Sequence, residues 1–478
     1  MPRRSVNLQT RDGASFTEGM RVIDEQLEVP QGFPPDVVAA AEQAAAHPRM
    51  PELDRTDIPL VTIDPEGSMD LDQALHIQRT GDGYRLRYAI ADVAAFVEPG
   101  DPLDLEAHRR GQTLYAPDHR VSLHPPVLSE GAASLLPDEV RPALVWTIDL
   151  DAEGDSTFVE VVRARVRSRA KLEYVGVQKA IDDGSADEVL TLLKEVGELR
   201  LRREQEREGV SLPLPEQEVV VGDDGWSLQY RRLLPVEQWN AQISLLTGMA
   251  CAQMMLYGEV GIVRTLPPAP ERAVDKLRHT AAALRLHWHP DVDYPDFVRS
   301  IDPNTPAGAA MLNACTALLR GAGYVAFDGG VPEHIEHAAI AAEYAHTTAP
   351  LRRLVDRYAG EVAVALCADE DIPDWVRARL RALPKEMDES DQRSHQFEAA
   401  VLSLVEAGIL EPYVGRTFTG VITEVDSDSG AKGAVMLHEP AVEASVTSAD
   451  AALPLGQEVQ VRLIEADKSK RLVRFVLA

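Results

Sequence analysis

Hydrophobic residues alternate with polar ones, or form short runs, in four segments of the first third of the chain. Gly, Pro or Asp residues flank these segments, and short runs bounded by turn residues are typical of β-strands. The predicted strands are Leu60–Ile63, Tyr84–Ile90, Ala143–Leu150 and Phe158–Arg169. Ahead of them, Pro35–Ala46 combines strong helix formers with prolines at its start, which predicts a helix.

From Ser185 onward the hydrophobic positions recur with the period of a helix. Ser185 and Glu188 match a capping box, which predicts a helix that starts there and stops near Gly209. Further helices are expected over Trp239–Leu256, Pro270–Leu286, Pro306–Arg320, Pro350–Leu366 and Glu386–Glu406.

The last segment, Gly415–Leu477, returns to short strands separated by Gly and Asp turns. The predicted strands are Thr417–Val425, Gly433–Leu437, Glu458–Ile464 and Leu472–Val476. Their number and spacing suit a small five-stranded barrel of the OB type. The chain is therefore expected to hold an N-terminal extension (1–58), a mixed α/β body with a sheet flanked by helices (59–412), and an all-β OB-fold barrel (413–478).

Composition narrows the class of protein. No stretch approaches ~20 uninterrupted apolar residues, the length that crosses a bilayer, so no membrane segment is expected. The basic N-terminus has no apolar segment behind it, which argues against a secretory signal. Three dispersed cysteines fit a reducing compartment, and a cytoplasmic location is expected.

The net charge of −29 by itself argues against a nucleic-acid partner, because phosphate binding depends on Lys and Arg. Net charge, however, does not describe the inside of a cleft. Basic residues do alternate along one predicted strand, at Arg163, Arg165, Arg167, Arg169 and Lys171. A face of this kind can follow a phosphate backbone, and it is equally compatible with a solvated outer face.

Three aspartates, Asp64, Asp70 and Asp72, are concentrated in the stretch Thr62–Leu75. In an extended backbone the spacing of Asp70 and Asp72 places both carboxylates on one side. The turn signalled by Pro65 and Gly67 can bring Asp64 back towards them. Converging carboxylates repel each other unless a cation lies between them, and Mg²⁺ prefers such oxygen ligands.

Other interpretations of this stretch are open. It can be an Asp-rich surface loop with no bound ion. An EF-hand fits poorly, because Ala74 stands where a ligand is needed and the closing Glu is absent. A pair of glycosidase carboxylates has no supporting signal.

An ordered series of motifs resembles the catalytic domain of the ribonuclease II and ribonuclease R family. The matching segments are Thr62–Leu75, Tyr88–Val93, Arg110–Pro117, Leu123–Ser129, Ser134–Pro137, Arg167–Tyr174 and Tyr344–Arg353. The resemblance implies hydrolytic, processive 3′-to-5′ degradation of single-stranded RNA to nucleoside 5′-monophosphates by a monomer that needs no protein partner. It also implies a narrow channel that leads the RNA 3′ end to the acidic residues.

Carried over by position, the resemblance assigns the metal ligands and the catalytic residues. Asp64, Asp70, Asp72 and Gln73 match the family's four-acid signature, with Mg²⁺, or alternatively Mn²⁺, as the cofactor of a two-metal mechanism. Asp70, Asp72 and Arg352 are the expected catalytic residues, with Arg352 on the scissile phosphate. For Arg352 and Arg353 the alternative is a surface ion pair with Asp356 or Glu361.

The resemblance also implies contacts with RNA outside the acidic stretch. Tyr115 is expected to stack on a nucleotide at the 3′ end, and a buried core tyrosine is the alternative. The remaining expected RNA-binding residues are Arg167, Arg169, His346, Arg353 and Glu398. His334 and His337 lack the spacing of a zinc protease and are interpreted as structural.

The chain departs from the family pattern in three places. Gln73 replaces the fourth aspartate, and a neutral amide supplies no charge to a metal. Residues 1–58 are too few for the two cold-shock barrels that family members carry. No aromatic clamp residue is evident near Gly258–Thr265. Two rival hypotheses follow: a non-catalytic RNA-binding protein, and a structural relative whose acidic loop binds calcium.

Overall fold

The computed structural model describes residues 13–117, 119–214, 216–222, 225–426, 429–437, 439–449 and 452–478. Its larger part is built on a sheet that closes into a five-stranded barrel in the order β1-β2-β3-β6-β7. These strands are β1 (Leu60–Asp64), β2 (Gln73–Thr80), β3 (Gly83–Ala91), β6 (Val140–Leu150) and β7 (Ser156–Glu173). All neighbours are antiparallel except β1 and β7, whose parallel pairing closes the barrel.

Helices cover this barrel because its hydrophobic side chains extend outward as well as inward. Trp146 and Tyr88 are almost fully buried, in one hydrophobic core with residues of several helices. The helices that contribute most are α5 (Glu188–Glu206), α6 (Pro235–Tyr257) and α10 (Leu354–Ala368). A second core on another side of the barrel includes residues of α2 (Pro35–Ala46) and α3 (Pro102–Arg110).

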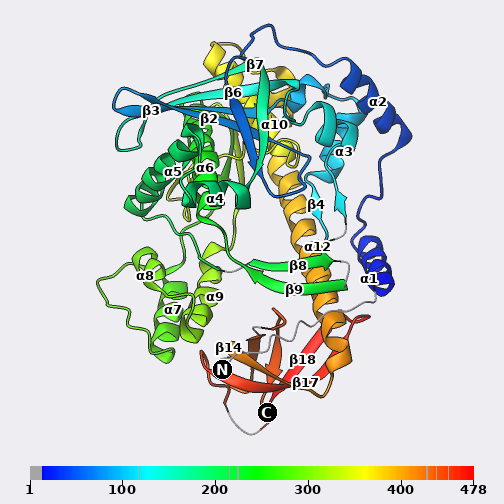
Figure 1. The fold of residues 1–478 in the computed structure, drawn as a ribbon, viewed down its shortest axis with the longest axis vertical. Helices are drawn as coiled ribbons and strands as arrows, with labels where there is room; N and C mark the ends of the chain where they lie inside the picture. Colours follow the sequence, from blue (N-terminus) through cyan, green and yellow to red (C-terminus); the bar gives the residue numbers. More distant parts are fainter. Residues whose placement is uncertain are drawn as a thin grey trace.

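A long helix connects this body to a second barrel (Figure 1). The 28-residue helix α12 (Leu383–Leu410) runs from the body to the C-terminal barrel, with α1 (Gly13–Gln26) packed against it. Helices α7 (Glu271–Ala283), α8 (Tyr294–Ser300) and α9 (Pro306–Cys315) contribute to a hydrophobic core of their own. The other elements are α4 (Tyr174–Asp182), α11 (Asp374–Leu380), the hairpin β8–β9 (Glu216–Gly222, Gly225–Arg231), the pair β10–β11 (Val260–Thr265, Gly323–Asp328), and the short pairs β4–β5 (Leu114–Tyr115, Arg120–Val121) and β12–β13 (Glu336–His337, Ala342–Glu343).

The C-terminal segment forms the predicted five-stranded barrel, closed in the order β14-β15-β16-β18-β17. Its strands are β14 (Thr417–Val425), β15 (Lys432–Leu437), β16 (Glu443–Thr447), β17 (Glu458–Asp467) and β18 (Leu472–Leu477). The sequence pattern did not indicate β16. Phe475 and Val461 lie in its core and are fully buried.

Several predicted helix starts differ from the structure: α6 begins at Pro235 rather than Trp239, and α12 at Leu383 rather than Glu386. Helix α5 begins at Glu188, but its cap is Asp187, whose carboxylate accepts a hydrogen bond from Leu190 N at 3.0 Å, rather than Ser185. Helix α10 begins at Leu354 and not at Pro350, because the four preceding residues form a loop whose backbone bonds to other segments. Within the described residues, no helix has the length and apolar character needed to cross a membrane.

Candidate active site

The acidic stretch is the connection between β1 and β2. Since these strands are antiparallel, the chain must reverse direction after Asp64, and Gly67 takes a positive φ of 79° that a residue with a side chain rarely adopts. Beyond the turn, Leu71 is fully buried and its N–H donates to the Ser134 hydroxyl at 2.9 Å. Asp70 and Asp72 flank Leu71, and they lie close enough for the charge of Asp70 to act on the Asp72 carboxyl.

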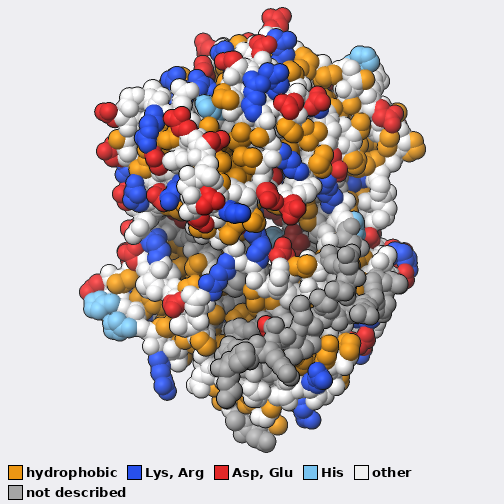
Figure 2. Space-filling model, in the orientation of Figure 1, with side chains coloured by type: hydrophobic (Ala, Val, Ile, Leu, Met, Phe, Trp, Pro, Cys, Tyr) orange, Lys and Arg blue, Asp and Glu red, His pale blue; other side chains and the backbone are white. Residues whose placement is uncertain are grey.

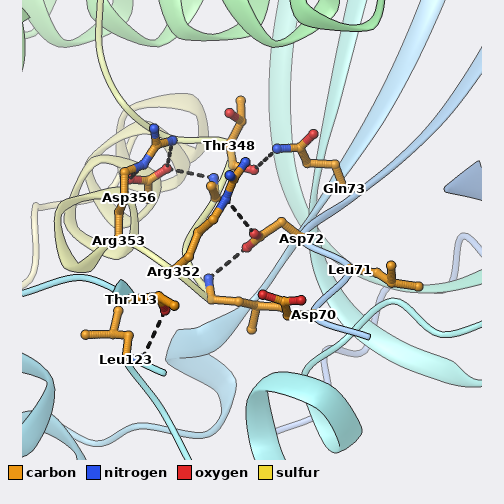
Figure 3. Close-up of polar contacts among 12 residues, drawn as sticks. Asp70, Leu71, Asp72, Gln73, Thr113, Leu123, Thr348, Arg352, Arg353 and Asp356 are labelled. Atoms are coloured by element: carbon orange, nitrogen blue, oxygen red, sulfur yellow. Dashed lines mark hydrogen bonds and ion pairs between the residues drawn. The ribbon is translucent and has the colours of Figure 1, made fainter. Parts of the chain in front are cut away.

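Asp72 is the most enclosed of the three aspartates, and two groups from a distant loop hold it (Figure 3). Its Oδ1 accepts a hydrogen bond from Leu351 N at 2.8 Å, and its Oδ2 lies 3.3 Å from Nε of Arg352. Only 6% of the Asp72 side chain is exposed, whereas 47% of the Arg352 side chain is. Arg352 thus has one acidic partner below it and an open side towards solvent.

Arg353 has a different environment from its neighbour. Its Nε and Nη2 donate to the Asp356 carboxylate at 2.9 and 2.8 Å, and Asp356 also accepts from Ala349 N at 2.7 Å (Figure 3). Arg353 therefore forms the ion pair with Asp356 that was the alternative, although the pair is largely buried rather than on the surface. Its guanidinium braces the loop, and the expected direct contact with RNA is a prediction that this pairing disfavours.

Asp70 is paired with an arginine that the sequence analysis did not single out. Nη1 of Arg120 lies 2.6 Å from Oδ1 of Asp70, and its Nη2 lies 2.6 Å from Oε1 of Glu130. Arg120 is on β5, directly opposite Tyr115 of β4. The place of Arg120 beside Tyr115 depends on the pairing of β4 with β5. Only recognition of that hairpin in the sequence would have pointed to Arg120.

Burial disfavours the ionised forms of the aspartates in the acidic stretch. It raises the pKa of Asp72 to about 7 and that of Asp64 to about 6, although the charge of Arg352 opposes the shift in both. The charge of Asp70 raises both pKa values further. A cation bound among these oxygens would stabilise their ionised forms.

The expected gathering of three aspartates around a metal is not present in this conformation. Among the described residues, no three or more His, Cys, Asp or Glu side chains are arranged to hold an ion. The physical reason is that Asp70 is drawn to Arg120, while Asp72 is drawn to Leu351 N and Arg352. The donors are the carboxylate oxygens that Mg²⁺ prefers, so their chemistry fits the ion, but these side chains must reorient to bind it.

Gln73, the fourth expected metal ligand, has an amide that is engaged by protein groups in this structure. Its Nε2 donates to the carbonyl oxygen of Thr348 at 2.6 Å, and its Oε1 accepts from the Tyr88 hydroxyl at 2.6 Å. Both ends of the amide are therefore bonded within the protein.

Tyr115 lies next to the acidic stretch with 45% of its surface exposed. Burial, followed by the charge of Asp70, raises its pKa to about 12. This exposed fraction excludes the alternative of a buried core tyrosine. It leaves Tyr115 accessible to a base that could stack on it.

The basic residues of β7 do not form one free face. Arg163 pairs with Asp92 and Glu361, Arg165 with Asp54, and Arg169 donates to the carbonyl oxygen of Thr56. Arg167 lies near the Asp54 carboxylate, whose pKa its charge helps to lower. Lys171, opposite Thr62 of β1, is the one whose charge acts on Asp64, so RNA contacts by Arg167 and Arg169 remain predictions.

The two other expected RNA-binding residues lie on separate elements. His346 accepts or donates at Nδ1 to the Tyr324 hydroxyl at 2.7 Å, and burial holds its pKa well below the usual value, so the ring is neutral. Glu398 is exposed on α12 and accepts from the Ser394 hydroxyl at 3.0 Å. A further neighbour of the site that the sequence analysis missed is Tyr174, whose hydroxyl accepts from Asn240 and whose pKa burial and then the charge of Asp64 raise.

Comparisons with known proteins agree with this architecture. The family model for the RNB domain matches residues 53–364, and that for the RNase II-type exonuclease C-terminal S1 domain matches residues 416–478. Ribonuclease R of Escherichia coli (strain K12) is 27% identical over 430 residues, which cover 83% of this chain and 51% of that protein. The chain thus spans about half the length of this curated relative.

Solved structures with the same fold are similar at lower identity. Mycoplasma genitalium RNase R in complex with ribose methylated single-stranded RNA superimposes with a TM-score of 0.87 and 18% identity, covering 98% of this chain and 79% of that one. Yeast Ssd1, described as a pseudonuclease, gives a TM-score of 0.72 and 16% identity over 91% and 56% of the two chains. Because the RNB model spans well over half of its length, this chain belongs to the RNB-domain family.

Proposed function

We propose that the protein is a metal-dependent hydrolytic exoribonuclease that shortens single-stranded RNA from its 3′ end and releases nucleoside 5′-monophosphates processively. The observation that carries the proposal is the half-exposed Arg352 guanidinium 3.3 Å from the buried Asp72 carboxylate, beside Asp64, Asp70 and the exposed Tyr115. Arg352 can bind the anionic phosphodiester, and the neighbouring carboxylates can bind a cation that contacts the same phosphodiester.

The chain's own residues have distinct parts in this proposal. Arg352 binds the scissile phosphate with its open side and stabilises the charge that develops there. Tyr115 holds the terminal base by stacking, which tolerates every base. Asp64, Asp70 and Asp72 would hold Mg²⁺ or Mn²⁺, which supplies a hydroxide nucleophile at neutral pH and stabilises the leaving oxygen.

The cellular setting belongs to the same proposal. We expect a monomer that acts in the cytoplasm without an obligatory protein partner. The three cysteines are free, with Cys251 and Cys315 buried, which is compatible with a reducing compartment.

The test is a time course with 5′-labelled single-stranded RNA, with Mg²⁺ and with chelator in parallel. A label that moves to ever shorter products with Mg²⁺, and stays on full-length RNA with chelator, supports the proposal. A circular RNA of the same sequence should resist, because it has no 3′ end. Asp72→Asn should abolish turnover while RNA binding is retained. Asp149→Asn, which breaks an ion pair with Arg85 at the other end of the barrel strands, is the matched control.

A non-catalytic RNA-binding protein is the second candidate. It is favoured by the pairing of Asp70 and Asp72 with arginines and by the bonded amide of Gln73. Retention of RNA with no shortening at any Mg²⁺ or Mn²⁺ concentration would support this candidate and overturn the first.

A further inference from the structure

Gln73 joins two parts of the molecule that are far apart in the sequence. Its backbone is part of the barrel, where Gln73 pairs with Ile90, and the preceding carbonyl, of Asp72, accepts from Ala91 N at 2.9 Å. Its side chain reaches the carbonyl oxygen of Thr348, in the loop that precedes α10 (Figure 3). A barrel strand is a rigid support, so the hydrogen bond from Gln73 restrains the position of Thr348.

The loop over residues 344–353 has no helical or strand structure at its centre and carries Arg352. It is tied to the rest of the protein by hydrogen bonds at several points. Ala345 N donates to Gly248 O at 3.1 Å, Ala349 N to Asp356, Leu351 N to Asp72, and Thr113 N to Arg352 O at 3.0 Å. The bond from Gln73 to Thr348 lies between the first and second of these, and ties the loop to the same strand start that positions Asp72.

Only an amide at position 73 makes both of its hydrogen bonds. Thr348 O is an acceptor, so its partner must be the N–H₂ group, which leaves Oε1 for the Tyr88 hydroxyl. That hydroxyl is also 2.8 Å from Ser244 Oγ, which fixes its orientation. A carboxylate at position 73 has no proton to donate and would place an anionic oxygen against the carbonyl of Thr348.

We propose that Gln73 is a positioning residue that braces the 344–353 loop, so that Arg352 is kept over Asp72, and that it is not a metal ligand. As a brace for a phosphate-binding arginine it rests on the proposed exoribonuclease function. It deepens that function by stating why this chain has an amide where an acid is expected: the position has exchanged a ligand for a loop support.

The experiment compares Gln73→Ala and Gln73→Glu with the unaltered protein in three measurements. Gln73→Glu keeps the size of the side chain, removes the donor and adds a negative charge, so it tests the bond without opening a cavity, while Gln73→Ala tests it without the charge. The matched control is Gln78→Ala on the same strand, whose Oε1 accepts from Arg87 and does not contact the loop. A thermal melt of each variant establishes that it is folded.

Hydrogen exchange of peptides covering 344–354, without metal or RNA, is the first measurement. If Gln73 braces the loop, the peptides should exchange several-fold faster in both Gln73 variants than in the unaltered protein. Gln78→Ala should exchange at the rate of the unaltered protein. Exchange equal to that of the unaltered protein would overturn the proposal. This readout does not need activity, so it separates the fate of the brace from that of the proposed function.

The second measurement is a calorimetric titration of each protein with Mn²⁺ in the absence of RNA. A positioning residue outside the ligand set leaves the Mn²⁺ affinity of Gln73→Ala within about twofold, whereas loss of a ligand or of its support lowers it about 10- to 100-fold. A rise in Mn²⁺ affinity in Gln73→Glu, with exchange unchanged, would identify position 73 as a ligand and overturn the brace.

RNA degradation under single-turnover conditions is the third measurement. Misplacement of Arg352 should lower the maximal rate of both Gln73 variants about 10- to 100-fold, with a smaller effect on the RNA concentration at half-maximal rate. A Gln73→Glu variant faster than the unaltered protein would overturn the proposal. If the unaltered protein itself degrades no RNA, the proposed function fails and the exchange measurement still decides on the brace.

Discussion

Arg120 and Asp70 are in direct contact, with 2.6 Å between Nη1 of the arginine and Oδ1 of the aspartate, and Glu130 holds the other end of the same guanidinium at 2.6 Å. Arg120 thereby forms an ion pair with a carboxylate that a divalent ion would need as a ligand. Metal binding at Asp70 must displace this guanidinium, or share Asp70 with it, and either costs free energy.

Removal of Arg120 should therefore strengthen metal binding. In Arg120→Ala, Asp70 loses its competing partner and the site loses one positive charge that repels a cation. We expect Mn²⁺ to bind about 3- to 10-fold more tightly in the absence of RNA, a difference on the order of 1 kcal/mol. Calorimetric titration measures this directly. Arg79→Ala, which breaks the exposed pair with Glu195, is the control. Weaker binding in Arg120→Ala would mean that Arg120 supports the metal site rather than competing for it.

Arg352 should matter for the rate far more than for the grip on RNA. Because its guanidinium faces Asp72 on one side and solvent on the other, Arg352→Ala should lower the cleavage rate by about 10²- to 10³-fold while RNA affinity changes little. Arg352→Lys should recover only part of the loss, since an ammonium does not fork onto two phosphate oxygens. Single-turnover rates and filter binding measure the two effects. Arg85→Ala is the control, and a rate within a few-fold of it in Arg352→Ala would contradict the assignment.

Tyr115 should contribute to RNA binding through its ring and not through its hydroxyl. Tyr115→Ala is expected to weaken the binding of a short RNA by about 1–3 kcal/mol, and Tyr115→Phe to leave it nearly unchanged. Fluorescence anisotropy in chelator measures binding without cleavage. Tyr257 offers a control, because it is 95% exposed on α6 and Tyr257→Ala removes an even more accessible ring away from the acidic stretch. Equal losses in the Tyr115 and Tyr257 variants would show that the ring at 115 has no special place.

Glu406 should make the stability of the protein depend on pH. Burial raises its pKa from 4.5 to about 7, although Gln217 donates to its carboxylate at 2.8 Å. A raised pKa means that the folded state holds a proton that the unfolded state has lost between those two values, so this group's contribution falls as pH rises from about 4.5 to 7. At about 1.36 kcal/mol per pKa unit, the loss is of the order of a few kcal/mol.

Glu406→Gln removes that ionisation and keeps the size of the side chain. The variant should be more stable than the unaltered protein at pH 8 and close to it at pH 4.5, as measured by urea unfolding across this range. Glu443→Gln is a useful comparison, because Glu443 lies beside Glu406 in the same region. An unchanged pH profile in Glu406→Gln would show that the buried carboxyl does not titrate there.

Several elements could be predicted because the information for them is local. Pro35–Ala46 and Thr417–Val425 form the helix and the strand with the expected bounds, since prolines, helix formers and alternating residues act over a few positions. Helix α10 starts four residues late because the loop before it bonds to Asp72, Asp356 and Thr113, partners that no local pattern contains. Strand β16 escaped notice because its short segment, Glu443–Thr447, joins the barrel through pairing with β15 and β18.

The sequence by itself determined many of the helices and strands, the family resemblance, and the set of residues with candidate chemistry around Asp64, Asp72, Tyr115 and Arg352. It also predicts that Asp70 and Asp72 share one side of the chain, because the two-residue repeat of an extended backbone is a local property. Tertiary structure alone decided which partner each of these side chains meets. Arg120 on Asp70, Leu351 N on Asp72 and Thr348 O on Gln73 are contacts between segments brought together by barrel closure and loop docking. Hydrogen bonds and ion pairs form over about 3 Å in space regardless of distance along the chain, so the same aspartates were visible in the sequence while their pairing was not.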